Sequence, residues 1–341
     1  MRIIWVPLEP LEERYTKDWA WQFPSEFQRC GVEVRTIAGR SLTEGIETGD
    51  VLDAYGTNYW KASQLMHLAE LWTTFGPDDV VFFADLWFPG VEMLQYMRAW
   101  NPAPRIVGVL HAGTWDKTDF TVRRGMRGWG QHFEEMLFSF LDQAFVATHY
   151  HRDMIVRTVE RDVRDRVVVT GLPFYREPFK KLARRERDNI VVFPHRLDPE
   201  KRPELFDAMA HALRPQFPDV RFIKTQDQEN RRKKAYYNLL SRAKVAVSFA
   251  EHEMWGYGML EATALGCIPV MPNCLSYKEL YPLRYLYEGN GAATLVAQAL
   301  QGDLLPPDVD EIAVGSEAAI ENMIDVCRGL VSGGSSKRLT R

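Results

Sequence analysis

The chain has 341 residues, of which 46% are apolar and 26% are charged, and its formal net charge is −4. This composition is typical of a globular protein with two domains of ordinary size, and no run reaches the roughly 18 apolar residues of a membrane-spanning helix. A chain with negative net charge is not a general trap for polyanions, so nucleic-acid binding would need a local basic patch.

Alternating strand and helix patterns predict a parallel α/β sheet in the first half of the chain. Apolar runs predict strands at 2–6, 32–37, 78–84, 105–110, 143–148 and 166–170. We expect a long polar loop over 7–17, helices over 24–30 and 63–74, and a turn-like stretch over 55–63. Ligands of parallel sheets gather beyond the carboxyl ends of the strands, which makes the loop at 9–14 a candidate site.

Two polar side chains follow predicted strands of this sheet. Asp85 opens the stretch DLWFPG, and His111 opens the stretch HAGTWD. At the ligand edge of a parallel sheet either side chain could orient a substrate hydroxyl. The alternatives are a packed aromatic turn around Asp85 and a structural role for His111.

The stretch 117–132 is basic and aromatic. Guanidinium groups hold phosphates and aromatic faces stack on bases, so this stretch is the best candidate for a polynucleotide surface. The alternative is a mobile basic loop. The candidate nucleic-acid-binding residues are Arg123, Arg124, Arg127, Trp115, Phe120 and Trp129.

The second half repeats the α/β pattern after an expected hinge at 171–174 and a basic linker at 180–187. We expect strands at 189–193, 219–224, 244–249 and 267–271, and helices at 203–213, 229–241 and about 314–330. The turn after strand 189–193 has the sequence PHRLDPEKR and carries Arg196 and Lys201. An ordinary surface turn is the alternative interpretation of this segment.

The stretch 244–274 predicts a strand, a loop, a short helix and a second strand. Gly256 and Gly258 flank a tyrosine where the helix begins, so the backbone there can approach a ligand closely. A helix N-terminus favours anions, and the carboxylates of Glu253 and Glu261 are suited to binding hydroxyl groups beside a phosphate. An ordinary α/β turn with two solvated glutamates is the alternative.

The segment Glu253-MWGYGML-Glu261, followed by EATALGCIPV, resembles the signature of retaining GT-B glycosyltransferases of the glycogen-synthase-like kind. The resemblance implies that Glu253 contacts the donor sugar and Glu261 the ribose, while Arg196 and Lys201 hold the donor diphosphate. It also implies that His111 lies near the donor sugar. The backbone amides expected to meet the sugar and phosphates belong to Trp255, Gly256, Tyr257 and Gly258.

The resemblance implies an α/β chain with the GT-B fold, in which two Rossmann-like domains enclose a central cleft. We expect an acceptor-binding domain at 1–172, a nucleotide-sugar-binding domain at 173–309, a C-terminal helix at 310–331 that packs back across the domains, and a flexible tail at 332–341. The implied enzyme is a retaining hexosyltransferase without a cofactor. No metal is expected, because two cations and loop amides can neutralise the leaving diphosphate.

Two further resemblances concern the acceptor. VVFPHRLDPEKRPELF is similar to the tRNA-queuosine mannosyltransferase family, and LHAGTWDKTDFTVRRGMR is similar to glycosyltransferases of tailed phages that decorate hydroxymethylated DNA bases. The expected reaction moves glucose from UDP-glucose, or a sugar from a GDP-sugar, to 5-hydroxymethylcytosine in phage DNA after base flipping. The alternatives are a queuosine tRNA acceptor, a carbohydrate acceptor, or a non-catalytic nucleotide-sugar-binding protein.

The four cysteines, Cys30, Cys267, Cys274 and Cys327, show no metal-ligand spacing. A reduced, intracellular protein is the simplest interpretation, since disulfides are rare in that environment. We therefore expect a cytoplasmic protein, in an infected bacterial host if the chain is viral, with no membrane partner. The sequence does not determine the oligomeric state.

Overall fold

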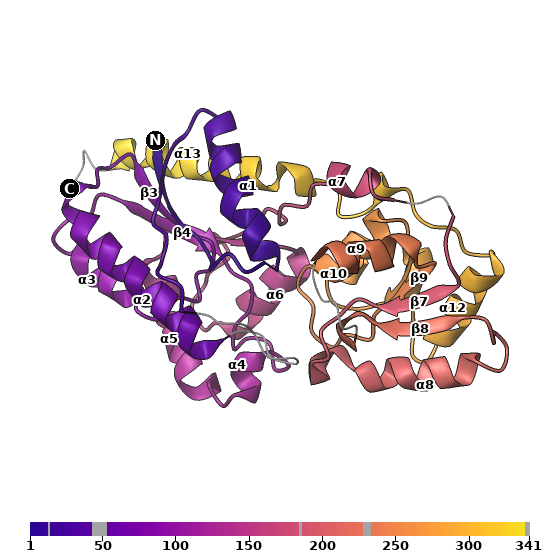
Figure 1. Cartoon of the computed structure of the whole chain (residues 1–341). Coiled ribbons are helices and arrows are strands. Elements are labelled where there is room, and N and C mark those ends of the chain that lie inside the picture. Colours follow the sequence, from indigo (N-terminus) through magenta and orange to yellow (C-terminus); the bar gives the residue numbers. More distant parts are fainter. Residues whose placement is uncertain (13, 43–52, 184–185, 228–232, 338–341) are drawn as a thin grey trace. The chain divides into compact units, whose positions relative to one another are not determined.

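A computed structural model describes residues 1–12, 14–42, 53–183, 186–227 and 233–337 (Figure 1). These residues divide into two compact units. Unit 1 comprises the described residues up to Pro173 together with those from Ala318 onward, and unit 2 runs from Phe174 to Glu317. No helix in the described part of the chain is long and apolar enough to cross a membrane.

Unit 1 is a parallel six-stranded sheet with helices on both faces, and its strand order is β2-β1-β3-β4-β5-β6 (Figure 1). The strands are β1 (Arg2–Val6), β2 (Glu33–Thr36), β3 (Asp79–Phe83), β4 (Arg105–Val109), β5 (Gln143–Val146) and β6 (Val167–Val169). The helices are α1 (Tyr15–Arg29), α2 (Ala54–Leu71), α3 (Glu92–Arg98), α4 (Phe120–Arg123), α5 (Arg127–Phe140), α6 (His149–Thr158) and α13 (Ala319–Lys337).

Unit 2 is a parallel five-stranded sheet in the order β11-β10-β9-β7-β8. Its strands are β7 (Ile190–Phe193), β8 (Arg221–Lys224), β9 (Val245–Val247), β10 (Ile268–Pro272) and β11 (Leu286–Tyr287). Its helices are α7 (Glu177–Lys180), α8 (Pro203–Leu213), α9 (Lys233–Arg242), α10 (Tyr257–Ala264), α11 (Tyr277–Leu280) and α12 (Ala292–Gln301). Figure 1 shows α9 and α10 on one face of this sheet, with α8 and α12 on the other. The predicted α/β class, with one parallel sheet in each half of the chain, is confirmed.

The helix predicted over 24–30 is the second half of a longer helix, because α1 already begins at Tyr15 and passes through Pro24 to Arg29, so the predicted loop over 7–17 ends three residues early. Trp19, Phe23 and Phe27 recur at intervals of four residues and therefore share one helix face. That face is buried, and the Phe23 ring stacks on Trp5 of β1 with ring centroids 4.5 Å apart. This aromatic packing stabilises a helix whose internal proline removes one backbone hydrogen bond.

The predicted turn at 55–63 is wrong, because these residues belong to α2. The Asp53 side chain caps this helix by accepting hydrogen bonds from the backbone N–H groups of Tyr55 and Gly56. Behind the cap, Trp60, Gln64 and Leu68 repeat at intervals of four residues and are buried. Capping and a buried helical face outweigh the polar, aromatic composition that suggested a turn.

The C-terminal helix begins later and ends later than we expected. Ala313 and Gly315 have positive φ angles of 45° and 81°, which an α-helix does not tolerate, so the helix predicted from 310 starts only at Ala319. It extends to Lys337, which makes residues 332–337 of the predicted flexible tail helical, while 338–341 lie outside the described residues. Within unit 1, α13 packs against α1, where Arg328 donates a 2.7 Å hydrogen bond to the Cys30 carbonyl.

Each sheet has one point where the strand order reverses direction. In unit 1 the chain builds β2 on one side of β1 and then places β3 on the other side, and in unit 2 it does the same with β7, β8 and β9. Ligands of open parallel sheets bind beyond the carboxyl ends of the two strands at such a switch point. The topology therefore directs attention to residues following β1 and β3 in unit 1, and β7 and β9 in unit 2.

Candidate functional site

The switch point of unit 2 brings together the two predicted donor-binding segments. The turn containing Arg196 and Lys201 follows β7, and the loop containing Glu253 follows β9. Their side chains meet, because the Lys201 Nζ lies 3.2 Å from a Glu253 carboxylate oxygen and also donates to the His252 carbonyl. Residues 52 positions apart thus form one charged cluster at the carboxyl edge of the sheet.

The Lys201–Glu253 pair is largely removed from solvent, with side-chain exposures of 7% and 17%. Burial raises the pKa of the Glu253 carboxyl, but the Lys201 ammonium and the neighbouring His195 and His252 together outweigh burial and lower that pKa to about 2. Glu253 is therefore a carboxylate throughout the neutral range. A buried carboxylate can accept hydrogen bonds from sugar hydroxyls.

Arg196 lies beside two buried carboxylates of its own turn. Its guanidinium contacts Asp198 at 3.1 Å and Glu200 at 3.2 Å, and its side chain is 28% exposed. Burial raises the pKa of the Glu200 carboxyl. These contacts fix the direction of the guanidinium group, which is how a protein prepares a cation to bind an anionic ligand.

Two glycines let helix α10 begin close to the β7 turn. Gly256 has φ = +82°, a conformation that favours glycine. A Cβ atom on Gly258 would lie 2.5 Å from the Pro194 carbonyl oxygen, so a larger residue would push the helix away. The N-terminus of α10, with its partial positive charge, is therefore held against the turn that carries Arg196.

The remaining predicted donor residues lie in the same loop and helix. Glu261, one turn into α10, accepts a 2.8 Å hydrogen bond from the Tyr237 hydroxyl of α9. The Trp255 side chain is 5% exposed, so this residue can offer a ligand its backbone more readily than its ring. Tyr257 is half-buried and its ring lies 6.5 Å from that of Phe174.

His195 belongs to this site, although the sequence reasoning did not single it out. It is 6% exposed, and its Nε2 has no hydrogen-bond partner in the described part of the chain. Burial, and after it the positive charge of Lys201, lower the pKa of His195 to about 3, so the imidazole is neutral. The available signal was its position, directly before Arg196 at the end of a predicted strand.

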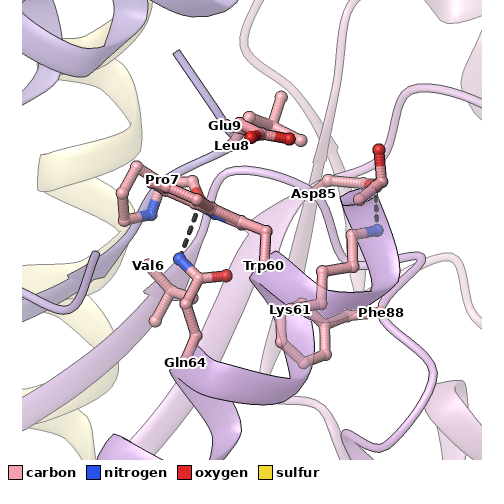
Figure 2. Close-up of a pocket in the computed structure, with 10 residues that line it drawn as sticks. Val6, Pro7, Leu8, Glu9, Trp60, Lys61, Gln64, Asp85 and Phe88 are labelled. Carbon is pink, nitrogen blue, oxygen red and sulfur yellow. Dashed lines mark hydrogen bonds and ion pairs between the residues drawn. The ribbon is translucent and has the colours of Figure 1, made fainter. Parts of the chain in front are cut away.

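The switch point of unit 1 forms a concave pocket beyond β1 and β3 (Figure 2). Counting space open to solvent, the pocket holds about 240 Å³. Glu9 and Asp85 line it from the loops after these strands, and Lys61 and Gln64 line it from α2. Glu9 belongs to the loop at 9–14 that we predicted as a candidate site, and its place in the pocket agrees with that prediction.

Asp85 is held in place by its neighbours. One carboxylate oxygen lies 2.9 Å from the Lys61 Nζ, and the other accepts a 3.0 Å hydrogen bond from the Trp87 backbone N–H. Lys61, which is 8% exposed, also donates to the Trp87 carbonyl at 2.7 Å. Figure 2 shows this ammonium directed at Asp85.

His111 follows β4, and both of its ring nitrogens have partners. Its Nε2 lies 2.7 Å from the Ala84 carbonyl, which can only accept, so this nitrogen carries the proton. Its Nδ1 therefore accepts from the Tyr15 hydroxyl at 3.4 Å. Burial lowers the pKa of His111 below its ordinary value of 6.5, which keeps the ring neutral.

The basic stretch 117–132 is folded, and the alternative of a mobile loop is wrong. The Asp119 side chain caps α4 by accepting from the Thr121 backbone N–H at 2.8 Å, and α5 begins at Arg127. Arg123 ends α4, Arg124 lies in the turn that follows and Arg127 begins α5, and all three are exposed. The three predicted phosphate-binding side chains are therefore accessible to solvent within one helix–turn–helix segment.

The aromatic candidates of this stretch differ in exposure. Trp129 is 50% exposed, and its ring lies 5.3 Å from that of Trp87, while Phe120 is half-buried. Trp115 is only 4% exposed and packs in the core against His151, so its predicted role in stacking on a base is wrong for this structure. Its aromatic side chain was needed to fill the interior.

Sequence reasoning also missed a buried carboxylate below this surface. Glu134 of α5 is 3% exposed and accepts hydrogen bonds from the Trp87 indole at 3.0 Å and from the Thr114 backbone N–H at 2.6 Å. Burial raises its pKa. Glu134 thereby fastens α5 to the loops that follow β3 and β4.

Comparison with known proteins supports the fold more strongly than the activity. No family model matches the sequence. A curated relative, the tRNA-queuosine alpha-mannosyltransferase of Drosophila melanogaster, is 25% identical over an alignment of 188 residues, and the match covers 46% of this chain and 50% of the relative. The chain thus matches only about half the length of this protein.

Several solved structures are similar over most of their length. Sucrose-phosphate synthase from Thermosynechococcus elongatus has a TM-score of 0.61 and 12% identity over 99% of both chains. The catalytic domain of starch synthase IV from Arabidopsis thaliana has a TM-score of 0.58 and 10% identity, covering 97% of this chain and 99% of that one. An α,α-trehalose-phosphate synthase from Burkholderia vietnamiensis has a TM-score of 0.57 and 13% identity, covering 83% and 80%.

The two parallel α/β units and these structural neighbours define the class: the chain has the GT-B fold of glycosyltransferases. The predicted fold is confirmed.

Proposed function

We propose that this protein is a glycosyltransferase that moves a sugar from a nucleotide diphosphate sugar to a hydroxyl group on a modified nucleobase. One observation carries the donor half of the proposal. The ionised Glu253 and its partner Lys201 lie at the switch point of unit 2, beside the glycine-bounded N-terminus of α10. This arrangement offers a carboxylate to sugar hydroxyls and positive charge to phosphates.

The expected mechanism retains the configuration of the donor linkage. Arg196, Lys201 and the amides at the start of α10 would stabilise the leaving diphosphate, and no metal is required for that task. Retention places the leaving and arriving groups on the same face of the sugar, so the diphosphate could itself take the proton of the acceptor hydroxyl. Glu253 would hold the sugar, and Glu261 the ribose. UDP-glucose is the first donor to test.

The acceptor proposed first is 5-hydroxymethylcytosine in phage DNA. The α4–α5 segment supports a nucleic-acid partner, since it carries the exposed Arg123, Arg124 and Arg127 and the half-exposed ring of Trp129. A stacked base cannot reach an enclosed site, so the base must be flipped out at a cost of a few kcal/mol. Contacts to the neighbouring phosphates offset that cost and make binding depend on salt.

Queuosine in tRNA is the second candidate acceptor. The curated relative named above acts, by its name, on that base, and it is 25% identical over 188 residues. Both acceptors present a hydroxyl group on a modified base, so the donor half of the proposal is the same for each.

The deciding experiment crosses UDP- and GDP-sugars with hydroxymethylcytosine DNA, unmodified DNA and queuosine tRNA, and identifies products by nucleoside mass spectrometry. We expect a hexosylated base from hydroxymethylated DNA and nothing from unmodified DNA, which lacks the nucleophile.

Other outcomes would change the proposal. If only tRNA gave a product, queuosine would replace 5-hydroxymethylcytosine as the acceptor. Transfer only to a carbohydrate would rule out both nucleobase acceptors. An α-donor that yields a β-linked product would show that the retaining mechanism is wrong. Donor binding without transfer or hydrolysis would indicate a non-catalytic binding protein.

A further inference from the structure

His195 has a buried polar atom that no described residue satisfies. Its Nε2 has no hydrogen-bond partner among the described residues, and the side chain is 6% exposed. Leaving a buried polar group unsatisfied costs about 1–3 kcal/mol. Native structures keep few such atoms, and each calls for an explanation.

Two neighbouring loops contain further atoms of this kind. The Trp255 indole Nε1 and the Ser276 hydroxyl are buried without a partner in the described part of unit 2. Trp255 lies in the loop after β9, and Ser276 follows β10, so all three atoms come after adjacent strands of one sheet. Polar groups that gather unsatisfied at the ligand edge of a sheet indicate a missing partner rather than isolated defects.

The surroundings of His195 identify the chemistry of that partner. Its ring packs edge-on against Phe193, with centroids 5.1 Å apart, which limits its rotation. Burial keeps the ring neutral, and Lys201 and Arg196 are both close enough to lower its pKa as well, while Glu253 raises it. A neutral imidazole can donate one N–H to an anion without adding a third charge beside two cations.

The backbone next to His195 meets the N-terminus of α10. The Pro194 carbonyl lies where a Cβ atom on Gly258 would come within 2.5 Å of it. His195 therefore lies near two cations, and its neighbour Pro194 lies against the N-terminus of α10; cations and a helix N-terminus both favour a phosphate group.

We propose that His195 is a further donor-binding residue, whose Nε2–H donates a hydrogen bond to the diphosphate of the nucleotide sugar. This inference rests on the proposed function, because it assumes that unit 2 binds such a donor. It goes further in assigning a neutral donor to the diphosphate in addition to Arg196 and Lys201.

The test is calorimetry with the nucleoside diphosphate and the nucleotide sugar that bind best to the wild-type chain in a panel of UDP and GDP compounds. His195→Phe keeps an aromatic ring against Phe193 and removes the hydrogen bond, whereas His195→Gln keeps a side-chain N–H. His211→Phe, on the exposed surface of α8, is the matched control.

We expect His195→Phe to weaken the binding of both ligands by about 10- to 100-fold, which is the range for the loss of a hydrogen bond to a charged group. The Gln variant should recover part of this loss, and the control should bind like wild type.

The outcomes separate the two proposals. If wild type binds no nucleotide or nucleotide sugar, the proposed function fails and this inference fails with it. If wild type binds and His195→Phe binds equally well, only the inference fails. A loss confined to the nucleotide sugar would place the contact on the sugar and overturn the diphosphate assignment.

A measurement on wild type covers the case in which His195→Phe does not fold. Histidine labelled with ¹⁵N, with the His195 resonance assigned through His195→Gln, should show a new slowly exchanging Nε2–H proton when the nucleoside diphosphate is added. No change in that resonance at saturation would overturn the proposal.

Discussion

Each unit contains a buried lysine–carboxylate pair at the ligand edge of its sheet. In unit 1 the Lys61 Nζ lies 2.9 Å from Asp85, and in unit 2 the Lys201 Nζ lies 3.2 Å from Glu253. In both pairs the lysine also donates to a backbone carbonyl of the loop that carries the carboxylate. In both, the carboxylate accepts from the backbone N–H two residues further along.

The two pairs differ in what surrounds them. Near Asp85 the other titratable candidate, His111, uses both ring nitrogens within the protein. Near Glu253 the corresponding histidine, His195, has one buried nitrogen that no described residue contacts by a hydrogen bond, and Arg196 adds a second cation. A buried ion pair at a sheet edge therefore does not by itself indicate a ligand site, because it also serves to fix a loop. Among the described residues, unit 2 is distinguished by the unsatisfied His195 nitrogen near the pair and by the second cation, Arg196.

The largest expected effect is on stability when either lysine is removed. Lys61→Met or Lys201→Met leaves a largely buried carboxylate without its cation, which costs roughly 3–5 kcal/mol. Urea denaturation should show a similar loss for both, and the double variant Lys201→Met/Glu253→Gln should lose less than Lys201→Met. If Lys201→Met were as stable as wild type, the two lysine–carboxylate pairs would not be equivalent in their contribution to stability.

Lys61→Met and Lys201→Met should differ in their affinity for the nucleotide sugar. Lys201→Met should weaken nucleotide-sugar binding at least about 10-fold, the loss of a charge-assisted hydrogen bond, whereas Lys61→Met should leave it unchanged. Calorimetry on folded samples measures this difference. Equal affinities in the two variants would show that Lys201 does not contribute to donor binding.

Acidification should destabilise the protein through His195. Its pKa falls from 6.5 to about 3 on folding, so between these values the unfolded chain binds a proton that the folded chain does not. The free energy of unfolding should therefore decrease as pH falls, by up to about 1.4 kcal/mol per pH unit. Urea unfolding between about pH 6 and pH 5 avoids most of the titration of Glu253, whose stabilisation is lost only as the pH falls below about 4.5. His195→Gln should reduce the slope, and an unchanged slope would contradict the assignment of a neutral buried imidazole.

A smaller effect is expected at the cap that positions the basic surface of unit 1. Asp119→Ala removes the side chain that accepts from Thr121 and should cost about 1 kcal/mol. Asp119→Asn keeps a capping oxygen and should lose much less, which thermal unfolding can resolve. Equal melting temperatures for the Ala and Asn variants would show that the cap does not stabilise α4.

The smallest stability effect, within about 0.5 kcal/mol, is expected for the exposed arginines of the α4–α5 segment. Replacing Arg123, Arg124 and Arg127 by alanine should nevertheless impair transfer to DNA and reduce its salt dependence, while donor hydrolysis continues. The matched control replaces Arg157, Arg161 and Arg164, which are also exposed in unit 1. If both triple variants lose DNA transfer equally, the effect is one of net charge and not of this surface.

The sequence alone determined the alternation of buried strands and helices, because apolar runs and helical periodicity reflect burial directly. It also marked the Glu253 loop, since Gly256 and Gly258 are chosen for backbone geometry that few other residues allow. It failed where long-range packing outweighs local preference. The aromatic face of α1 stabilises a helix through Pro24, and Trp115 fills the core instead of facing solvent.

Only the tertiary structure decided which polar residues have partners. The pairing of Lys61 with Asp85, and of Lys201 with Glu253, joins residues 24 and 52 positions apart. No local pattern encodes such distances, because strand order and not sequence separation sets which loops meet. For the same reason the sequence could not distinguish His111 from His195. The ring nitrogens of His111 are satisfied by Tyr15 and Ala84, whereas the Nε2 of His195 has no partner among the residues that the structure describes. The chemical difference between these two histidines depends on what the folded chain places beside them.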